Sequence, residues 1–434
     1  MTRFVCKPGG SLDGNFRVPG DKSISHRSII LASIADGSSH ISGFLQGEDS
    51  LNTMRAFQQM GVPIARNQGE VTVSGVGLHG LQAPATDLDM GNSGTAMRLL
   101  LGLLAGQSFD ARLIGDSSLS SRPMLRVIQP LQQMGAVIES ADGGRAPLQV
   151  RGGQVLEAID YRMPVASAQV KSCLLLAGLY ARGETIVHEP APTRDHSERM
   201  LRGFGCDVAS NAGEIRLRGN QALSACDIDV PADISSAAFF MVAASIASDS
   251  DITLQHVGIN PTRTGVIDIL KLMGADIDIV NRQEIGGEPV ADIRVRSAAL
   301  SGIEIPESLV PLAIDEFPVL FVAAACAVGE TRLSGAEELR VKESDRIQAM
   351  ADGLTRLEIE TEVKPDGIII QGGKLGGGEI DSHGDHRIAM AFSVASLAAR
   401  RDICIRDCSN VNTSFPGFAQ LAQRAGIRIS IDAG

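Results

Sequence analysis

The most regular feature of this chain is a set of six apolar segments, each preceded by a polar or ionic residue. Each segment is rich in Ala and Leu and apolar nearly all round, which predicts a helix buried in the core. The polar residues recur at intervals of roughly 70 residues, a spacing that indicates an internally repeated architecture. They are Asp21, Asn92, Ser167, Asp233, Asp315 and Asp385.

The N-terminus of a buried helix has a predictable chemistry. Its first four backbone N–H groups have no partner within the helix, and this end carries a partial positive charge. Several such ends directed to one place form a binding site for an anion. The repeat therefore predicts an enzyme that acts on small, negatively charged substrates.

A second pattern recurs between these helices: an amphipathic helix, a glycine and a strand. Each glycine stands where the end of a helix needs a left-handed residue, and strand-like segments such as 70–75, 147–152, 214–219 and 367–372 follow. The sixth copy carries Glu358 in place of the glycine. The other copies contain Gly61, Gly135, Gly205, Gly274 and Gly426.

Together the two patterns predict an α/β fold of six units, each with the order βαβαββ. Because 434 residues correspond to two or three domains, we expect two similar domains of three units. The chain is expected to cross between them near residues 18–20 and 230–232, beside the polar residues that begin two of the helices. The first strand would then belong with the C-terminal half, and the chain would cross twice.

Composition disfavours several classes of function. The net charge of −12, the absence of Trp and an aromatic content of 3% argue against nucleic acid as a partner. The apolar helices, about 12 to 15 residues long, are shorter than the roughly 20 needed to span a bilayer, so no membrane partner is expected. The N-terminus is too polar for a signal peptide, and seven irregularly spaced cysteines favour a reducing compartment. We therefore expect a cytoplasmic protein.

Basic residues are concentrated at the polar helix starts and glycine-rich turns, although the chain is acidic overall. Their guanidinium and ammonium groups suit carboxylates and phosphates. One solvated basic residue on a loop would mean little, but the set as a whole indicates anion binding. It comprises Lys22, Arg27, Arg98, Arg122, Lys171, Arg194, Arg340, Lys342, Arg346 and Arg387.

Three segments of the first half carry candidate chemistry. In GDKSISHR, Asp21 or Ser23 is expected to cap the helix, and Lys22 lies where a cationic pocket would suit proton transfer. GNSGTAMR offers small residues at a helix start but matches neither the P-loop nor the dinucleotide fingerprint. Pro123 is expected at the first position of a helix, which would place Arg122 at the start of that helix.

Two acidic positions of the second half leave alternatives open. Glu343, flanked by Lys342 and Arg346, belongs either to a salt-bridge network or to proton transfer. Asp315 precedes an apolar helix, where it is either a cap or a functional carboxylate.

The H-x-x-H pair of His383 and His386 is a weak metal-binding pattern. No further convincing ligand lies nearby, and the adjacent Arg387 would oppose a cation. We therefore expect no metal site there.

Eight segments, in this order, resemble the 5-enolpyruvylshikimate-3-phosphate (EPSP) synthase family. They are PGDKSISHRS, GNSGTAMR, RPM, ASAQVKS, IDEFP, RVKESDR, DHRIAM and TSFP, and they extend from residue 19 to residue 416. The resemblance implies two similar α/β domains, each of three βαβαββ units with buried helices, in an inside-out α/β barrel arrangement. It places one domain at residues 21–230, the other at 1–20 plus 231–434, and the active site in the cleft between them.

The resemblance also implies an activity. Members of this family transfer the enolpyruvyl group of phosphoenolpyruvate to the 5-hydroxyl of shikimate 3-phosphate and release phosphate, as part of aromatic amino-acid biosynthesis. The reaction proceeds by addition and elimination through a tetrahedral intermediate, without a metal or organic cofactor. Glyphosate is the inhibitor of the family, and we expect a monomer.

The resemblance also implies roles for individual residues. Lys22, Asp315 and Glu343 are the candidate catalytic residues, with Asp315 as the base and Glu343 or Lys22 as the proton donor. Shikimate 3-phosphate would be held by Lys22, Ser23, Arg27, Ser167, Ala168, Gln169, Arg194, Asp315 and Lys342. Phosphoenolpyruvate would be held by Lys22, Gly94, Arg122, Gln169, Arg346 and Arg387. Supporting positions are Asn92, Thr95, Arg98 and His386.

The chain departs from the family pattern in informative places. Asn412 precedes the TSFP segment near a position where many members carry a Lys, and Leu99 stands where many have Pro. RPMLRV, ASAQVKS and PTRDH resemble the glyphosate-tolerant class II. Gly94 is retained, whereas an Ala crowds the inhibitor in some tolerant members. We therefore expect ordinary or intermediate sensitivity, and Gly94→Ala should weaken glyphosate binding more than phosphoenolpyruvate binding.

Two alternatives come from different classes. The sister enzyme that transfers enolpyruvyl to UDP-N-acetylglucosamine shares the fold, but most members carry a cysteine on an N-terminal-domain loop. This chain has no cysteine between Cys6 and Cys173. A non-catalytic anion-binding protein is disfavoured because all the candidate acid–base groups are present. Two domains with converging helix ends also imply an open-to-closed transition, in which repulsion among unliganded cations keeps the domains open until an anionic substrate binds.

Overall fold

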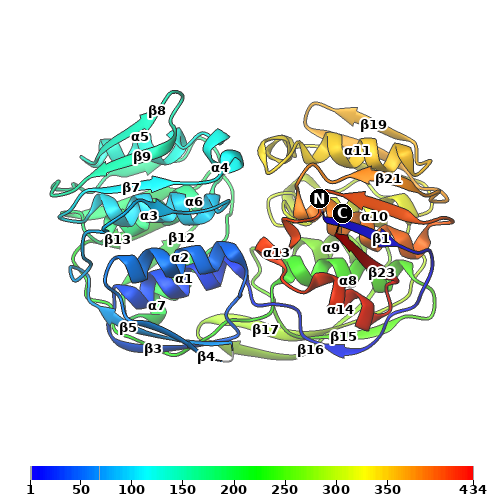
Figure 1. The fold of residues 1–434 in the computed structure, drawn as a ribbon, viewed down its shortest axis with the longest axis horizontal. Helices are drawn as coiled ribbons and strands as arrows, with labels where there is room; N and C mark the ends of the chain where they lie inside the picture. Colours follow the sequence, from blue (N-terminus) through cyan, green and yellow to red (C-terminus); the bar gives the residue numbers. More distant parts are fainter. Residues whose placement is uncertain (1, 68, 434) are drawn as a thin grey trace. The chain divides into compact units, whose positions relative to one another are not determined.

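The computed structural model describes residues 2–67 and 69–433, which form two compact units (Figure 1). We call them by their place in the sequence. The central unit comprises Gly20–Val230 together with the short segment Ile285–Glu288. The terminal unit comprises the described residues before Gly20, Pro231–Glu284 and those from Pro289 onward. The chain thus passes between units at four points, whereas the sequence predicted two. The additional two arise because residues 285–288 belong to the central unit and the residues on both sides of them belong to the terminal unit.

The central unit consists of three repeats with the same order of elements. The first contains α1 (Lys22–Ser33), β3 (Asp36–Ser42), α2 (Glu48–Gln59), β4 (Ile64–Asn67) and β5 (Glu70–Val76). The second contains β6 (Leu88–Asp89), α3 (Gly94–Ala105), β7 (Ala111–Ile114), α4 (Ser117–Ser121), α5 (Leu125–Gln133), β8 (Val137–Ala141) and β9 (Arg145–Arg151). The third contains β10 (Asp160–Arg162), α6 (Ala168–Gly178), β11 (Glu184–His188), α7 (His196–Gly203), β12 (Val208–Asn211) and β13 (Glu214–Arg218), and β14 (Ile228–Asp229) follows it.

Each repeat of the central unit forms a four-stranded sheet that mixes one parallel pair with antiparallel pairs. The strand orders are β6-β7-β9-β8, β10-β11-β13-β12 and β14-β3-β5-β4. In the last of these, β14 pairs in parallel with β3, so the final strand of the unit completes the sheet of its first repeat. This strand pairing links the end of the third repeat to the first repeat.

The terminal unit contains three further repeats. The first contains β2 (Asp13–Phe16), α8 (Ile234–Ile246), β15 (Asp251–Gly258), α9 (Gly265–Leu272), β16 (Asp276–Ile285) and β17 (Glu288–Arg296). The second contains η1 (Glu307–Leu309), α10 (Phe317–Cys326), β18 (Glu330–Leu333), η2 (Glu337–Val341), α11 (Arg346–Arg356), β19 (Thr361–Lys364) and β20 (Gly367–Gln371). The third contains β21 (Gly378–Asp381), α12 (His386–Ala395), η3 (Ser396–Ala398), β22 (Ile403–Arg406), α13 (Val411–Ser414), α14 (Phe418–Ala425), β23 (Ile429–Ala433) and β1 (Thr2–Cys6).

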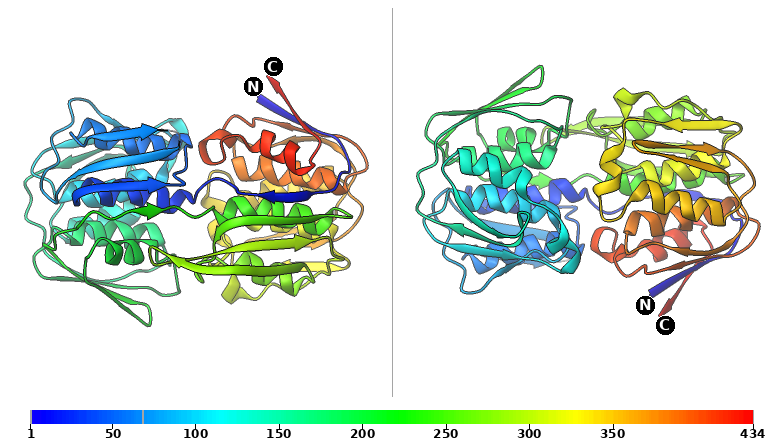
Figure 2. Two further views of the ribbon diagram at one scale, coloured as in Figure 1. Left: turned by 90° about the horizontal axis from the view of Figure 1, so that it is seen from below. Right: turned by 90° about the horizontal axis from the view of Figure 1, so that it is seen from above.

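The two N-terminal strands complete sheets of the terminal unit. β2 pairs in parallel with β15 in the order β16-β17-β15-β2. β1 lies between β22 and β23, so the strands that carry the two chain ends lie side by side (Figure 2). The remaining sheet has the order β18-β20-β19. The first strand therefore belongs with the second half of the chain, as the repeat pattern predicted.

The six predicted apolar helices are α1, α3, α6, α8, α10 and α12, and they form the cores of the two units. Every residue of α8 except Ile246 is buried, and α3 packs against α6 while α10 packs against α8 and α12. Sheets lie outside these helices within each unit (Figure 1). The helices are inside, as expected, but the six sheets stay separate and none closes into a barrel among the described residues.

Most of the predicted polar residues cap their helices. Four side chains accept a hydrogen bond from a backbone N–H of the first turn, and they are those of Asp21, Ser167, Asp233 and Asp385. At the other two helices the cap is one residue later: Ser93 caps α3, and Glu316 occupies the cap position of α10. The side chains of Asn92 and Asp315 are therefore directed to other contacts.

The residues that follow the amphipathic helices have the predicted left-handed backbone. Their φ angles are 86° at Gly61, 99° at Gly135, 83° at Gly205, 96° at Gly274 and 116° at Gly426. Glu358, in the sixth copy, has a φ of 69°, so a residue with a Cβ is held where glycine is preferred. Its carboxylate pairs with Arg400 at 2.7 Å and with Arg401.

We predict that Glu358→Gly stabilises the protein by about 1 kcal/mol, because relief of the left-handed strain outweighs the loss of two exposed ion pairs. Gly205→Ala is the matched opposite change, since a Cβ there meets no atom within 4 Å. Gly205→Ala should destabilise the protein by about 1 kcal/mol, solely because alanine is strained at this positive φ. Urea denaturation measures both variants, and a lower midpoint for Glu358→Gly would show that the ion pairs dominate.

Candidate active site

In the central unit, side chains at the starts of three buried helices are joined by hydrogen bonds. Gln169, near the start of α6, accepts a hydrogen bond from Arg98 Nη1 at 2.6 Å and donates one to Thr95 Oγ1 at 2.9 Å. Both partners lie on α3. Ser93, which caps α3, lies 3.5 Å from Nε2 of His26 on α1. The helix starts are thus held together by polar groups rather than by apolar packing alone.

Arg27 of α1 is buried and has a fixed direction. Its Nη1 donates to the Ser23 carbonyl at 2.9 Å, its Nε to Ser197 Oγ at 2.7 Å and its Nη2 to Ser172 Oγ at 2.7 Å. Burial and the nearby Arg194, opposed by the carboxylates around it, lower the pKa of Arg27 to about 10, so the side chain is charged at neutral pH. These contacts join α1, α6 and α7 around one cation.

Lys22 and Gly94 lie at the first positions of α1 and α3. The ammonium group of Lys22 pairs with the buried carboxylate of Asp49. A Cβ at Gly94 would lie 2.9 Å from Arg98 Nη1 and 3.5 Å from Arg122 Nη1. An alanine at Gly94 would therefore displace Arg98, the residue that hydrogen-bonds to Gln169.

Arg122 lies close to Gly94, but it does not occupy the predicted place at the start of a helix. Its Nη2 donates to Asn92 Oδ1 at 2.8 Å and to Ser118 Oγ at 3.2 Å. The expectation that it begins a helix is wrong, because Arg122 ends α4 and α5 begins at Leu125. Its extended backbone, with a ψ of 132°, is the conformation that the following Pro123 favours.

Lys171 does not contribute to an anion site, contrary to prediction. It is 1% exposed, and its Nζ lies 2.6 Å from Glu198 Oε1 and 3.0 Å from Glu189 Oε1. Burial raises the pKa of Glu198, while Lys171 acts in the opposite direction. The lysine is directed into the core to neutralise two carboxylates that the sequence pattern did not associate with it.

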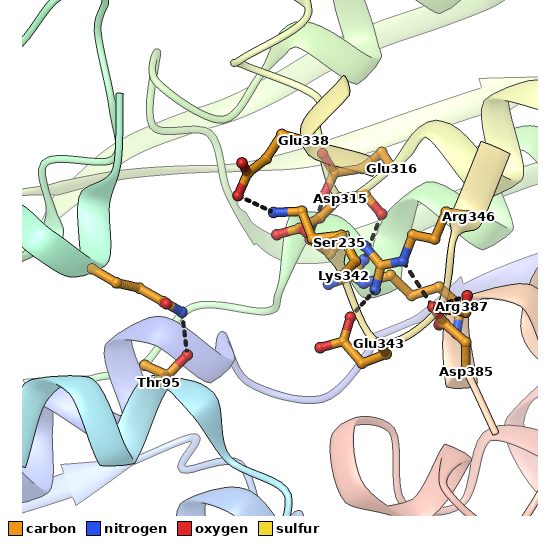
Figure 3. A network of polar contacts seen from close by, with 12 residues as sticks. Thr95, Ser235, Asp315, Glu316, Glu338, Lys342, Glu343, Arg346, Asp385 and Arg387 are labelled. Carbon is orange, nitrogen blue, oxygen red and sulfur yellow. Dashed lines mark hydrogen bonds and ion pairs between the residues drawn. The ribbon is translucent and has the colours of Figure 1, made fainter. Parts of the chain in front are cut away.

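In the terminal unit, Arg346 lies at the centre of a network of carboxylates (Figure 3). It is 1% exposed. Its Nε donates to Asp385 at 2.9 Å, its Nη1 to Asp315 at 3.3 Å and its Nη2 to Glu343 at 2.6 Å. Burial alone would lower the pKa of Arg346, but the three carboxylates raise it well above its usual value. Burial likewise opposes the charge of Asp385, yet Arg346 keeps the pKa of that carboxyl below its ordinary value.

Other predicted residues surround this network. Arg387 Nη1 donates to the backbone carbonyl of Asp315 at 2.9 Å, and the buried His386 directly follows the cap residue of α12. Lys342 Nζ lies 3.7 Å from Glu338. Among the described residues, no three or more His, Cys, Asp or Glu side chains are grouped so as to hold a metal ion.

Arg263, which the sequence pattern did not single out, contacts residues at the starts of α8 and α10. It is 3% exposed, and its Nη2 donates to Ser235 Oγ at 2.7 Å. The same nitrogen lies 3.4 Å from Asp233 and 3.7 Å from Glu316. The signal for it was indirect: two acidic residues at the starts of buried helices α8 and α10 require a cation.

Comparison with known proteins identifies the family. Residues 6–421 match the family described as EPSP synthase (3-phosphoshikimate 1-carboxyvinyltransferase). The chain belongs to the EPSP synthase family. The 3-phosphoshikimate 1-carboxyvinyltransferase of Alkalilimnicola ehrlichii is 67% identical to it over 98% of this chain and 96% of the relative. That of Methylococcus capsulatus is 63% identical over 99% and 98%.

The fold agrees with solved members of the EPSP synthase family. The structure of EPSP synthase from Acinetobacter baumannii matches this chain with a TM-score of 0.91 and 56% identity, covering 100% of both chains. The predicted two-domain α/β fold and the predicted transferase activity in the shikimate pathway are therefore confirmed. No helix among the described residues has both the length and the hydropathy required to cross a bilayer. The roles of individual residues stay predictions.

We predict that His26 makes the stability depend on pH. This side chain is fully buried, and burial together with Lys22 and Arg27 lowers its pKa well below the ordinary value. Because a histidine of the unfolded chain titrates near pH 6.5, the unfolded state binds a proton that the folded state does not. Stability should therefore fall as the pH falls below about 6.5, by up to about 1.4 kcal/mol per pH unit.

Urea denaturation between pH 7.5 and 5.5 measures this slope. His26→Asn is the test variant, since its amide can still contact Thr53, whose Oγ1 lies 2.7 Å from His26 Nδ1. The slope should be smaller in the variant, and equal slopes in the two proteins would contradict the prediction.

Proposed function

We propose that this chain transfers the enolpyruvyl group of phosphoenolpyruvate to the 5-hydroxyl of shikimate 3-phosphate with the residues around its helix starts. The observation that carries the proposal is the attachment of Asp315 and Glu343 to adjacent nitrogens of the buried Arg346. A buried ion network is weak evidence for stability, whereas carboxylates held in fixed directions suit proton transfer.

Shikimate 3-phosphate is proposed to bind through polar side chains at and near the helix starts. Arg27 and Gln169 support this role because each side chain is fixed in direction by two or more hydrogen bonds at the starts of α1 and α6. Fixed side chains lose little entropy when a charged ligand binds. The further proposed contacts are Lys22, Ser23, Ser167, Ala168, Arg194, Asp315 and Lys342.

Phosphoenolpyruvate is proposed to bind through cations and a glycine. The guanidinium groups of Arg98 and Arg122 lie close to Gly94, whose missing side chain lets a small anion approach the start of α3. The further proposed contacts are Lys22, Gln169, Arg346 and Arg387, with Asn92, Thr95 and His386 in support. Glyphosate, also a small anion, is proposed to bind beside Gly94.

The proposed chemistry has two stages. In the addition, Asp315 accepts the proton of the 5-hydroxyl as this oxygen bonds to C2 of phosphoenolpyruvate, and Glu343 or Lys22 gives a proton to C3. In the elimination, C3 loses a proton and the C2–O bond to phosphate breaks, which restores the double bond. Arg and Lys side chains offset the charge of the departing phosphate. We also propose that the enzyme works as a monomer in the cytoplasm, since one chain supplies the full residue set.

The acceptor decides between this function and that of the sister enzyme. We predict rapid phosphate release from phosphoenolpyruvate with shikimate 3-phosphate and none above background with UDP-N-acetylglucosamine. Release with the second acceptor would overturn the proposal. Release with neither, from folded protein that binds shikimate 3-phosphate, would favour a non-catalytic binding protein.

We predict that Asp315→Asn and Glu343→Gln each lower kcat by about 10²- to 10⁴-fold, the range for loss of a proton-transfer group. Both amides keep an oxygen that Arg346 can hydrogen-bond, so the KM values should change little. Glu330→Gln is the control, because that exposed carboxylate pairs with Arg332 of the same strand, β18. Near-normal turnover in either test variant would remove that residue from the mechanism.

A further inference from the structure

The hairpin formed by β16 and β17 has a tip with unusual surroundings. The strands belong to a sheet of the terminal unit, but the tip, Ile285–Glu288, belongs to the central unit. Gly286 and Gly287 have φ angles of 58° and 80°, as in a two-residue type I′ turn, and this turn fixes the residue that follows. That residue, Glu288, is only 5% exposed, although glutamate is rarely buried unless it is paired.

The tip holds the first turn of α7. Glu288 Oε1 lies 2.7 Å from Nδ1 of His196, the first residue of that helix, and the imidazole is 2% exposed. One residue earlier in the tip, the carbonyl of Gly287 accepts a hydrogen bond from Arg199 Nη1 at 2.8 Å. Arg199 also donates through Nε to Asp195 at 2.8 Å. Two adjacent residues of the tip therefore fix one turn of the helix.

That turn also carries the group that orients Arg27. Ser197, next to His196, accepts a hydrogen bond from Arg27 Nε at 2.7 Å and donates one to Ser172 Oγ at 2.7 Å. Arg27, Ser197 and Ser172 are all buried, so a shift of α7 cannot be absorbed by solvent. A single peptide bond separates the residue held by the tip from the residue that holds Arg27.

We propose that Glu288 is a positioning residue for shikimate 3-phosphate: it holds His196, which fixes Ser197 and thereby the guanidinium of Arg27. This inference rests on the proposed function, in which Arg27 binds that substrate. Apolar residues of similar volume often stabilise a core as well as a buried polar pair does. The carboxylate of Glu288 is therefore better explained by the direction in which it holds His196 than by stability.

The test compares Glu288→Met, which fills the same volume without an acceptor, with Glu288→Gln, which keeps one. We expect Glu288→Met to raise the Kd of shikimate 3-phosphate, measured without phosphoenolpyruvate, and its KM by about tenfold, as for loss of a buried hydrogen-bond partner. The KM of phosphoenolpyruvate should stay within about twofold, because its proposed contacts do not depend on α7. Glu288→Gln should restore most of the affinity. Glu284→Met, the same change at an exposed position of the hairpin, is the control.

Unchanged affinity for shikimate 3-phosphate in Glu288→Met would overturn the proposal, and so would an equal loss for both substrates or a change in the urea midpoint alone. If Glu288→Met does not fold, Arg199→Met removes the second contact of the tip and is judged by the same criteria. Wild-type protein that neither binds nor converts shikimate 3-phosphate would instead refute the proposed function, which separates the two failures.

Discussion

The buried N-termini of six apolar helices are the constraint on which the rest of the structure depends. A helix can be buried only if its unpaired N–H groups and the charges beside them find partners within the protein. Asp385 illustrates the solution, because it caps α12 and is itself neutralised by Arg346. Arg346 in turn holds Asp315 and Glu343, so the contacts that permit burial also fix the groups proposed for catalysis.

The same logic explains why the polar groups have little freedom. Arg27 is held by two buried serines, and Gln169 is held by Arg98 and Thr95, at the starts of helices that pack tightly behind them. Around the buried Arg27 in particular, close packing leaves little room for these groups to move. The core therefore acts as the support of the site, and substitutions behind it are expected to affect affinity as well as stability.

The repeated elements could be predicted from the sequence because their causes are local. An all-apolar run predicts a buried helix wherever it occurs, and the left-handed position after each amphipathic helix was recognisable even where Glu358 replaces glycine. Cap positions were displaced by one residue where two cap-competent side chains adjoin, as at Asn92 and Ser93. Contacts made over long sequence distances could not be predicted: Lys171 pairs with Glu198 of α7 and with Glu189 in the loop after β11, and His196 and Glu288 are 92 positions apart.

In the proposed reaction, proton transfer at C3 of phosphoenolpyruvate accompanies attack by the 5-hydroxyl of shikimate 3-phosphate. The most direct measurement is NMR of the product formed in D₂O by the wild-type protein. Addition through a tetrahedral intermediate converts the C3 methylene into a methyl group that contains one solvent deuteron, and elimination then removes any one of its three hydrogens. Deuterium is expected in the methylene group of the enolpyruvyl product. Product that forms with no deuterium at that carbon would contradict it.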